Sequence, residues 1–258
     1  METDTTRFDG LAEAYDAYRR PYPRALFRDL AGMVPASAHC AVDVGAGTGI
    51  STEGLLQHLP GSWMVIGVEP GDDMRRVLTR RLQRWPNVQA NPSVAEAIHL
   101  PDRSAGLVSA FTAVHWFEPG AFFAEARRLL VPGGILALGR NRRRPEGAVA
   151  EIDAFVREHS EVLRDMTRWE KAKMPLQAQV EAVEGFHDVQ LRSYAWSERV
   201  SMGDLLDLYL TRATVMEVVR GIGLRAFRDR FETICAAHHG LDPFELRWDA
   251  TLLTARRG

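Results

Sequence analysis

Cysteine is scarce in this chain, and its two thiols do not stand at a spacing that binds a metal or forms a redox pair. Cys40 and Cys235 are the two cysteines in 258 residues. Thiols this isolated favour small buried side chains in a reducing compartment over a disulfide framework. The eight histidines also lack metal-ligand spacing, since the adjacent His238 and His239 would point apart on a helix. The sequence therefore predicts no metal site.

Positive charge from lysine is also nearly missing. Lys171 and Lys173 are the two lysines, so arginine carries almost all of the positive charge. The formal net charge of −2 gives no general field that would attract a polyanion. We expect neither nucleic acid nor an anionic membrane surface as a partner.

Long apolar runs and several catalytic motifs are absent as well. No segment approaches the length that spans a bilayer, and the first residues lack the pattern of a signal peptide, so we expect a cytoplasmic protein. Neither a Gly-x-Ser-x-Gly elbow nor a Gly-x-x-x-x-Gly-Lys loop is present, which argues against acyl and phosphoryl transfer. Hydrophobic residues make up 46% of the chain, enough for the core of one domain.

What the chain does have is a glycine bend at Gly45–Gly49. Ala41–Val44 is typical of a short buried strand, glycines at 45, 47 and 49 interrupt it, and a helical pattern follows. A strand that passes through glycines into a helix brings backbone N–H groups and a bare main chain close to a cofactor. Glycines also serve purely conformational needs in a turn, so the bend alone leaves the function open.

An acidic residue follows the second predicted strand. Ser62–Val68 leads into Glu69, twenty residues beyond Gly49. At the end of the second strand of a βαβ unit, a carboxylate grips a ribose diol because it accepts from two hydroxyl groups at once. Gly45–Glu69 by itself would nearly fit a nicotinamide (NAD(P)) oxidoreductase, which is the enzymatic alternative.

Five motifs follow one another along the chain: Asp43-x-Gly-x-Gly-x-Gly, Gly-Val-Glu69-Pro with Met74, Ser93–Asp102, Leu107–Phe117 with its His-Trp pair, and Ala126–Leu138. In this order they resemble the class I S-adenosylmethionine-dependent methyltransferases, of the small-molecule, trans-aconitate methyltransferase-like type (methyltransferase domain type 11). The resemblance covers residues 8–140 and, more weakly, the rest. It implies an α/β, Rossmann-like fold: a seven-stranded, mostly parallel sheet with helices on both faces and a helical lid. It also implies S-adenosyl-L-methionine as cofactor and S-adenosyl-L-homocysteine as product.

The resemblance further implies which residues contact the cofactor. Arg20-Pro-Tyr22-Pro closes on the methionine end, where Arg20 pairs with the carboxylate. Met74 lies against the adenine and Ser93–Asp102 folds around it, although Val94 replaces the polar residue usual in the family. Core packing is the alternative for Tyr15 and Met74. The cofactor set is Tyr15, Arg20, Asp43, Gly45, Ala46, Gly47, Gly49, Glu69, Pro70, Met74, Ala95, Glu96 and Phe111.

The acceptor site is expected outside the carboxyl ends of the strands, where ligands of open parallel sheets bind. His115 is the candidate base because histidine takes up a proton near neutral pH, and lining the pocket is its alternative role. The arginines at 140 and 142–144, predicted as a loop, either hold an anion or form a solvated surface. Weaker candidate bases are Tyr15, Glu118 and Tyr209, and the acceptor set is His115, Trp116, Arg140, Arg143, Trp169 and Tyr209.

We expect one methyltransferase domain over residues 1–258, as a monomer or homodimer. It consists of an N-terminal helical cap (1–24), a cofactor-binding core (25–140), a helical lid insertion (141–183) and a C-terminal part (184–258) that completes the sheet and the pocket. The acceptor is expected to be a small molecule of secondary metabolism, with O-methylation favoured over C-, N- or S-methylation. A catalytically silent partner subunit is the non-enzymatic alternative.

Overall fold

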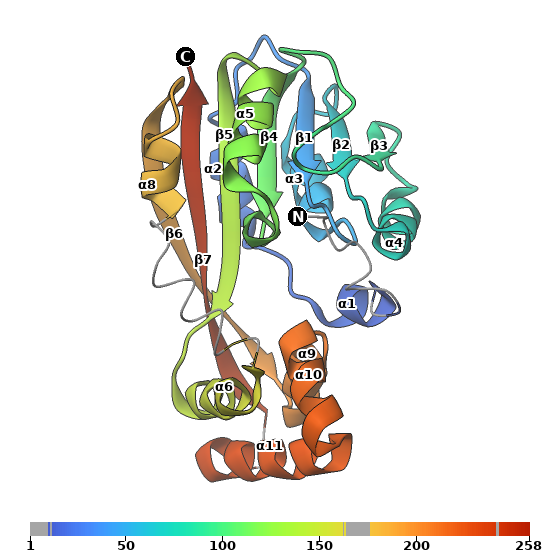
Figure 1. The fold of residues 1–258 in the computed structure, drawn as a ribbon, viewed down its shortest axis with the longest axis vertical. Coiled ribbons are helices and arrows are strands. Elements are labelled where there is room, and N and C mark those ends of the chain that lie inside the picture. The colour runs from blue at the N-terminus through green and yellow to red at the C-terminus, as the bar shows by residue number, and fades with distance from the viewer. Residues whose placement is uncertain (1–9, 11, 162, 164–175, 241–242) are drawn as a thin grey trace.

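Seven strands form the single sheet at the centre of the molecule. They are β1 (Cys40–Val44), β2 (Met64–Val68), β3 (Val88–Asn91), β4 (Ala105–Phe111), β5 (Leu130–Arg143), β6 (Phe186–Val200) and β7 (Phe244–Arg257). This computed structural model describes residues 10, 12–161, 163, 176–240 and 243–258. The strand order is β3-β2-β1-β4-β5-β7-β6 (Figure 1), and β7 alone among these seven strands runs antiparallel. The predicted Rossmann-like fold is confirmed.

Helices cover both faces of the sheet because its central strands are apolar on both sides. One face packs against α2 (Arg24–Ala31), α3 (Ile50–His58) and α4 (Asp72–Leu82). The other face packs against α5 (Pro119–Leu129) and α8 (Leu176–Glu181).

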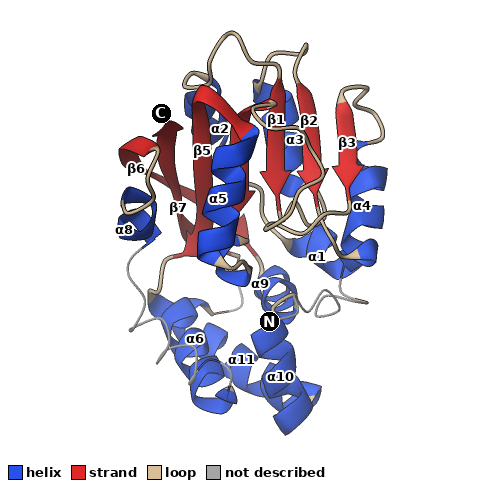
Figure 2. Cartoon of the chain, turned by 45° about the horizontal axis from the view of Figure 1, so that its top comes forward, coloured by secondary structure: helices blue, strands red, loops and turns tan. Residues whose placement is uncertain are grey.

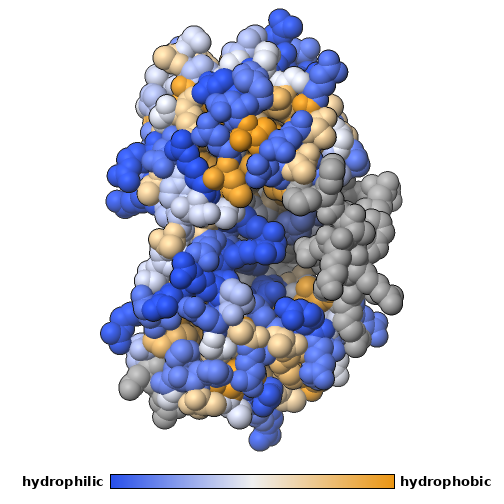
Figure 3. All heavy atoms as spheres, turned by 90° about the vertical axis from the view of Figure 1, so that its left-hand side faces the viewer, coloured by the Kyte–Doolittle hydropathy of each residue, from blue (hydrophilic) through white to orange (hydrophobic). Residues whose placement is uncertain are grey.

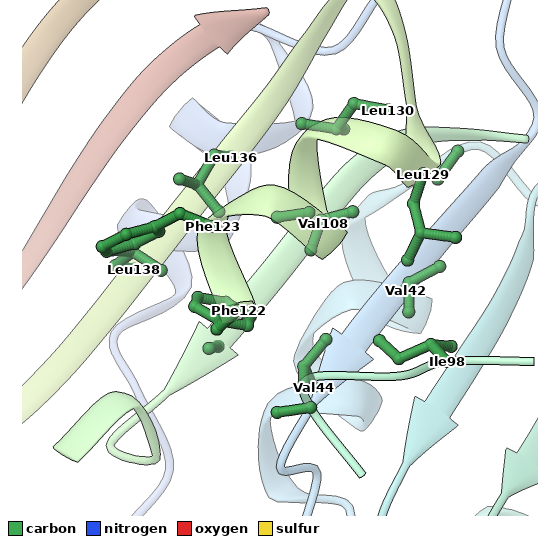
Figure 4. Close-up of a cluster of buried hydrophobic side chains, with 14 of the residues drawn as sticks. Val42, Val44, Ile98, Val108, Phe122, Phe123, Leu129, Leu130, Leu136 and Leu138 are labelled. Atoms are coloured by element: carbon green, nitrogen blue, oxygen red, sulfur yellow. The ribbon is translucent and has the colours of Figure 1, made fainter. Parts of the chain in front are cut away.

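The contact between α5 and the sheet shows how this layer is stabilised. Phe122, Phe123 and Leu129 of α5 lie over Val42 and Leu138 of the strands (Figure 4). Phe122 and Leu129 are completely buried, and burial of one such side chain stabilises a fold by roughly 1.5–3 kcal/mol. This apolar layer holds the strand ends in register for the site.

Four further helices, which we call the helical layer, cover the carboxyl ends of the parallel strands (Figures 1 and 2). They are α6 (Gly147–His159), α9 (Met202–Leu210), α10 (Ala213–Ile222) and α11 (Leu224–His239). The layer has its own apolar core, in which Tyr209, Phe227 and Phe231 are at most 1% exposed. α1 (Ala12–Tyr18) contacts both α4 and α9, so the N-terminal segment bridges the sheet domain and the layer.

The arginines at 140, 142 and 143 belong to β5 and not to a loop, so that prediction was wrong. β5 continues beyond Gly139 because β7 runs beside it, with Arg140 opposite Thr251 and Arg143 opposite Trp248. Side chains of a strand point away from the backbone ladder, so charged residues do not interrupt the pairing.

A short break separates two consecutive helices of the helical layer. α9 ends at Leu210 and α10 begins at Ala213. Thr211 Oγ1 donates to Leu208 O at 2.7 Å, and Arg212 has extended backbone angles (φ −93°, ψ 125°). The break directs the Arg212 side chain to Asp153 of α6, where it forms an ion pair.

On the face shown in Figure 3, hydrophilic residues gather between the sheet and the helical layer. Apolar cores lie on either side of this hydrophilic zone. Among the helices that the structure describes, none combines the length and the apolar character needed to cross a bilayer.

Candidate active site

The glycine bend joins β1 to α3 through three residues with left-handed backbone: Gly45 (φ +67°), Gly47 (φ +56°) and Gly49 (φ +90°). A side chain costs roughly 1–2 kcal/mol in this conformation. At Gly45 a Cβ would also lie 2.6 Å from Ala113 Cβ, whereas at Gly47 it would meet nothing within 4 Å. Gly45 is therefore required by packing, and Gly47 leaves room for a ligand.

Asp43 lies completely buried beneath the bend. Its Oδ2 accepts from Ser51 Oγ at 2.7 Å and Thr52 Oγ1 at 2.8 Å, and its Oδ1 accepts from Ser109 Oγ at 2.8 Å. Burial raises the pKa of this carboxyl, and the three hydroxyl groups oppose the rise. Because it has no accessible surface, Asp43 ties β1 to α3 and β4 and does not contact a cofactor directly. This corrects its predicted role.

Glu69 follows β2 and reaches the bend. Its Oε2 accepts from Gly47 N and its Oε1 from Gly71 N, both at 2.9 Å. Burial raises the pKa of Glu69, while these N–H groups and the charge of Arg75 oppose the rise. Each carboxylate oxygen has two acceptor sites, so one site remains on each oxygen. That arrangement suits two neighbouring hydroxyl groups.

Ala46 and Pro70 use their main chains to fix the bend. Ala46 N donates to Val68 O at 3.0 Å, and Arg75 Nη1 donates to Pro70 O at 2.9 Å. Thr48 Oγ1, in contrast, is buried without a hydrogen-bond partner in the described part of the chain. A buried hydroxyl without a partner is unfavourable, so Thr48 is a further candidate for ligand contact.

The predicted adenine loop, residues 93–102, is held by α5. Arg128 donates to Ile98 O at 2.9 Å, and Glu96 Oε1 accepts from Glu118 N at 2.8 Å. Ala95 is buried beside this contact. The loop is thus fixed near the bend, and adenine contacts by Ala95 and Glu96 stay a prediction.

The N-terminal cap rests on α4. Met74 is 5% exposed and packs against Ala12 and Tyr15 of α1, so a contact with adenine stays a prediction. The Arg19 guanidinium lies 4.6 Å from the centre of the Tyr15 ring. Arg19 Nε is buried and has no hydrogen-bond partner within the described ranges. Arg19 therefore offers an unused donor.

Arg20 is already paired inside the protein. Its Nε donates to the two carboxylate oxygens of Glu198 at 2.7 and 2.9 Å, and its Nη1 donates to Tyr18 O at 3.2 Å. Glu198 also accepts from Trp248 Nε1 at 3.0 Å. Arg20 thus fastens the cap to β6 and β7, which corrects its predicted pairing with the cofactor.

A strained residue that the sequence did not reveal stands at the end of β4. Thr112 has φ +54°, which is rare for a β-branched residue, and its Oγ1 lies 2.6 Å from Tyr22 OH. The Tyr22 ring packs against Phe111 with centroids 4.8 Å apart. Burial raises the pKa of Tyr22, so its phenol keeps its proton. Strain of this kind clusters at functional sites.

His115 and Trp116 lie in a 3-10 turn (Val114–Trp116) directly after β4. Both side chains are exposed, and their rings are 4.5 Å apart. The carboxylate of Glu118 accepts from Gly120 N at 3.2 Å and Ala121 N at 2.5 Å. Glu118 therefore caps α5, and its weaker candidacy as a base stays a prediction.

Arg143 and Tyr209 meet beneath the helical layer, with the guanidinium 3.9 Å from the ring centroid. Tyr209 donates to Asp153 at 3.0 Å, and burial raises its pKa, which disfavours it as a base. Arg140 is exposed and points to the opposite face of β5 from Arg143, because side chains alternate along a strand. It does not share the pocket as predicted. Trp169 lies outside the described residues.

The glycine bend after β1 and the acidic residue after β2 face each other at the carboxyl edge of the sheet. This arrangement is typical of Rossmann-like enzymes that bind a nucleotide cofactor. The model of the methyltransferase domain family matches residues 42–138. An uncharacterized methyltransferase of Mycobacterium tuberculosis is 30% identical over 235 residues, 91% of this chain and 87% of that protein. The chain belongs to the S-adenosylmethionine-dependent methyltransferase family.

Two further comparisons agree with this membership. Trans-aconitate 2-methyltransferase of Acidovorax ebreus is 36% identical over 105 residues, 40% of this chain and 38% of that protein. A solved methyltransferase structure from Anaeromyxobacter dehalogenans aligns with a TM-score of 0.68 at 26% identity, covering 93% of this chain and 98% of that one. Methyl transfer is thereby favoured over the nicotinamide alternative. In the described ranges no three His, Cys, Asp or Glu side chains gather as metal ligands.

Proposed function

We propose that this enzyme binds S-adenosyl-L-methionine across the glycine bend and transfers its methyl group to a small-molecule acceptor beneath the helical layer. The observation that carries the proposal is Glu69: Gly47 N and Gly71 N each occupy one of its oxygens, leaving one acceptor site on each for the ribose diol. The open space at Gly47 gives the nucleoside a close approach. The helical layer acts as the lid.

Arg19 holds the methionine carboxylate in this proposal. Its buried Nε has no hydrogen-bond partner in the part of the chain that the structure describes, whereas Arg20 is paired with Glu198. The Tyr15 ring positions the Arg19 guanidinium at a cation–π distance.

The sulfonium of the cofactor already activates the methyl group, so the protein contributes mainly alignment of the acceptor, which removes roughly 7–11 kcal/mol of barrier. A base is needed where the acceptor is protonated, as a phenol is. His115 fills that role, because it follows β4 and is exposed. With a phenol as acceptor, His115→Ala lowers turnover roughly 100-fold or more while the cofactor affinity is kept. Unchanged turnover would remove His115 from the mechanism.

The acceptor is a small acid or phenol of secondary metabolism, methylated on oxygen. The similar Acidovorax protein is named for trans-aconitate, which carries carboxylate oxygens. The direct test incubates the enzyme with radiolabelled S-adenosyl-L-methionine and separate sets of carboxylic acids, phenols, amines and thiols. Label is expected in an acid or phenol set, and transfer to amines or thiols alone would overturn O-methylation. A silent partner subunit would label none of the sets.

A further inference from the structure

Arg143, the last residue of β5, is a buried cation with an unused donor. Its side chain is 10% exposed, and its Nη1 is buried with no hydrogen-bond partner among the described residues. Buried charges in proteins are normally paired, because removing an ion from water is strongly unfavourable. The charges of the surrounding side chains therefore decide whether Arg143 is balanced.

Asp153, the carboxylate nearest to Arg143 among the described ion pairs, is hydrogen-bonded to other side chains. Asp153 Oδ1 lies 3.7 Å from Arg143 Nη2, beyond hydrogen-bond distance. The same oxygen accepts from Arg212 Nη1 at 2.8 Å and from Tyr209 OH at 3.0 Å. These four side chains carry two positive charges and one negative charge. The cluster is short of one negative charge.

The Arg143 guanidinium is held in place by its contact with the Tyr209 ring. Its carbon lies 3.9 Å from the centre of the Tyr209 ring, and Arg212 approaches the same ring at 5.4 Å. Tyr209 is fully buried and anchored through Asp153, so the stacked arginine cannot swing far. Burial and the charges of Arg212 and Arg19 lower the pKa of Arg143, yet arginine keeps its proton in proteins.

We propose that Arg143 binds a carboxylate of the methyl acceptor, with Tyr209 and Arg212 fixing the guanidinium that receives it. In the proposed function the methionine carboxylate neutralises Arg19, whose charge also acts on Arg143. The remaining excess of one positive charge matches a monoanion better than a dianionic phosphate. This inference rests on the proposed function, because it places the carboxylate on the molecule that is methylated.

The position of Arg143 also describes the shape of that acceptor. Phe111 at the end of β4 pairs with Gly139, and Arg143 is four residues further along β5. At about 3.3 Å per residue, roughly 13 Å of strand separates Arg143 from Gly139, beside the end of β4. In this proposal the acceptor therefore extends past the end of β4 to reach Arg143 with its carboxylate.

A carboxylate could reach Arg143 from the methionine part of the cofactor instead, and the experiment separates these sources. The enzyme, saturated with S-adenosyl-L-homocysteine, is titrated calorimetrically with acetate, succinate, benzoate and 4-phenylbutyrate, and with the amides of the last two. We expect an aryl carboxylate to bind and its amide not to bind. Arg143→Met weakens that binding at least tenfold and leaves the homocysteine affinity within twofold of the wild type. Arg142→Gln, exposed on the opposite face of β5, is the matched control with no change.

Several results would overturn the assignment. One is wild-type enzyme that binds none of the carboxylates, and another is Arg143→Met that binds them unchanged. Weakened binding of S-adenosyl-L-homocysteine with unchanged binding of methylthioadenosine, which lacks the amino acid part, would give Arg143 to the cofactor. If the wild type binds neither nucleoside, the proposed function is wrong. The carboxylates can still be titrated into the ligand-free enzyme, so this failure is distinguished from a failure of the assignment of Arg143.

Thermal unfolding of the ligand-free variant distinguishes a binding role from a structural one. Replacing an unpaired buried cation with methionine keeps the apolar contact with Tyr209, so the melting temperature stays the same or rises by about 2–4 °C. A clear fall would mean that Arg143 serves the fold and would contradict the proposal.

Discussion

The glycine bend and the helical layer differ in how their charged side chains are hydrogen-bonded. At the bend, Asp43 accepts from three hydroxyl groups and Glu69 from two N–H groups. Beneath the layer, Arg143 has a buried nitrogen without a hydrogen-bond partner among the residues that the structure describes, and so does Arg19 in the cap. The bend is therefore preorganised by the chain itself, whereas the opposite side of the site carries charge that a ligand has to balance. Each of the following experiments tests either the preorganised bend or the opposite side of the site.

The largest effect is expected at Glu69. Glu69→Ala removes two hydrogen bonds of a charged group to the ribose, each contributing about 1.5–3 kcal/mol, and releases Gly47 N and Gly71 N. The dissociation constant of S-adenosyl-L-homocysteine should rise roughly 100-fold or more in calorimetry. Asp72→Ala, whose carboxylate is 91% exposed three residues away, should bind normally. Equal affinities of the two variants would contradict a ribose contact by Glu69.

The free energy of unfolding is expected to distinguish Gly45 from Gly47 in the bend. Gly45→Ala places a methyl group 2.6 Å from Ala113 Cβ in a left-handed conformation, so we expect a loss of about 2–5 kcal/mol in the free energy of unfolding. Gly47→Ala meets open space and should lose about 1–2 kcal/mol. Urea denaturation measures both values. Similar losses would show that packing does not distinguish these positions.

The cap gives a smaller effect in cofactor affinity. Arg19→Gln removes one charged partner of the methionine carboxylate, so the dissociation constant of S-adenosyl-L-homocysteine should rise about tenfold. Methylthioadenosine, which lacks that carboxylate, should bind as before. Arg20→Gln is the control: it should keep the affinity but loosen the cap from Glu198, which limited proteolysis detects. The reverse pattern would restore Arg20 as the cofactor ligand.

The effect with the most gradual onset is the pH dependence of binding. Because burial raises the pKa of Glu69 above the ordinary carboxyl range, its proton competes with the ribose at a higher pH than an exposed carboxyl would allow. Affinity for S-adenosyl-L-homocysteine should therefore fall as the pH is lowered from 7 toward about 4.3, by no more than about tenfold per pH unit. Calorimetry at several pH values tests this. A wild-type profile as flat as that of Glu69→Gln would disprove the link.

The parts of the site that the sequence predicts are those encoded within short segments. The glycine spacing, the strand before it and Glu69 after β2 lie within a single βαβ unit, so their geometry follows from local patterns. Arg19 and Arg20 show the limit. Which of the two is unpaired depends on Glu198, 178 residues away from Arg20, and no pattern around the pair reveals it.

The cluster around Arg143 is less predictable still. Arg143, Asp153 and Tyr209 come from β5, α6 and α9, and the charge balance appears only when these elements meet. The extension of β5 depends on its pairing with β7. The charged residues at the end of β5 hide this pairing in the sequence, because a run of arginines is typical of a solvated loop. Thr112 carries no sequence signal, since its strain is a property of backbone angles that an ordinary strand end does not announce.

The most direct test of the central claim is an equilibrium titration of the wild-type enzyme with S-adenosyl-L-homocysteine, compared with a titration with NAD. The account predicts saturable binding of the first at a stoichiometry of one per chain and no binding of the second. No heat with S-adenosyl-L-homocysteine, or saturable heat with NAD, would contradict it.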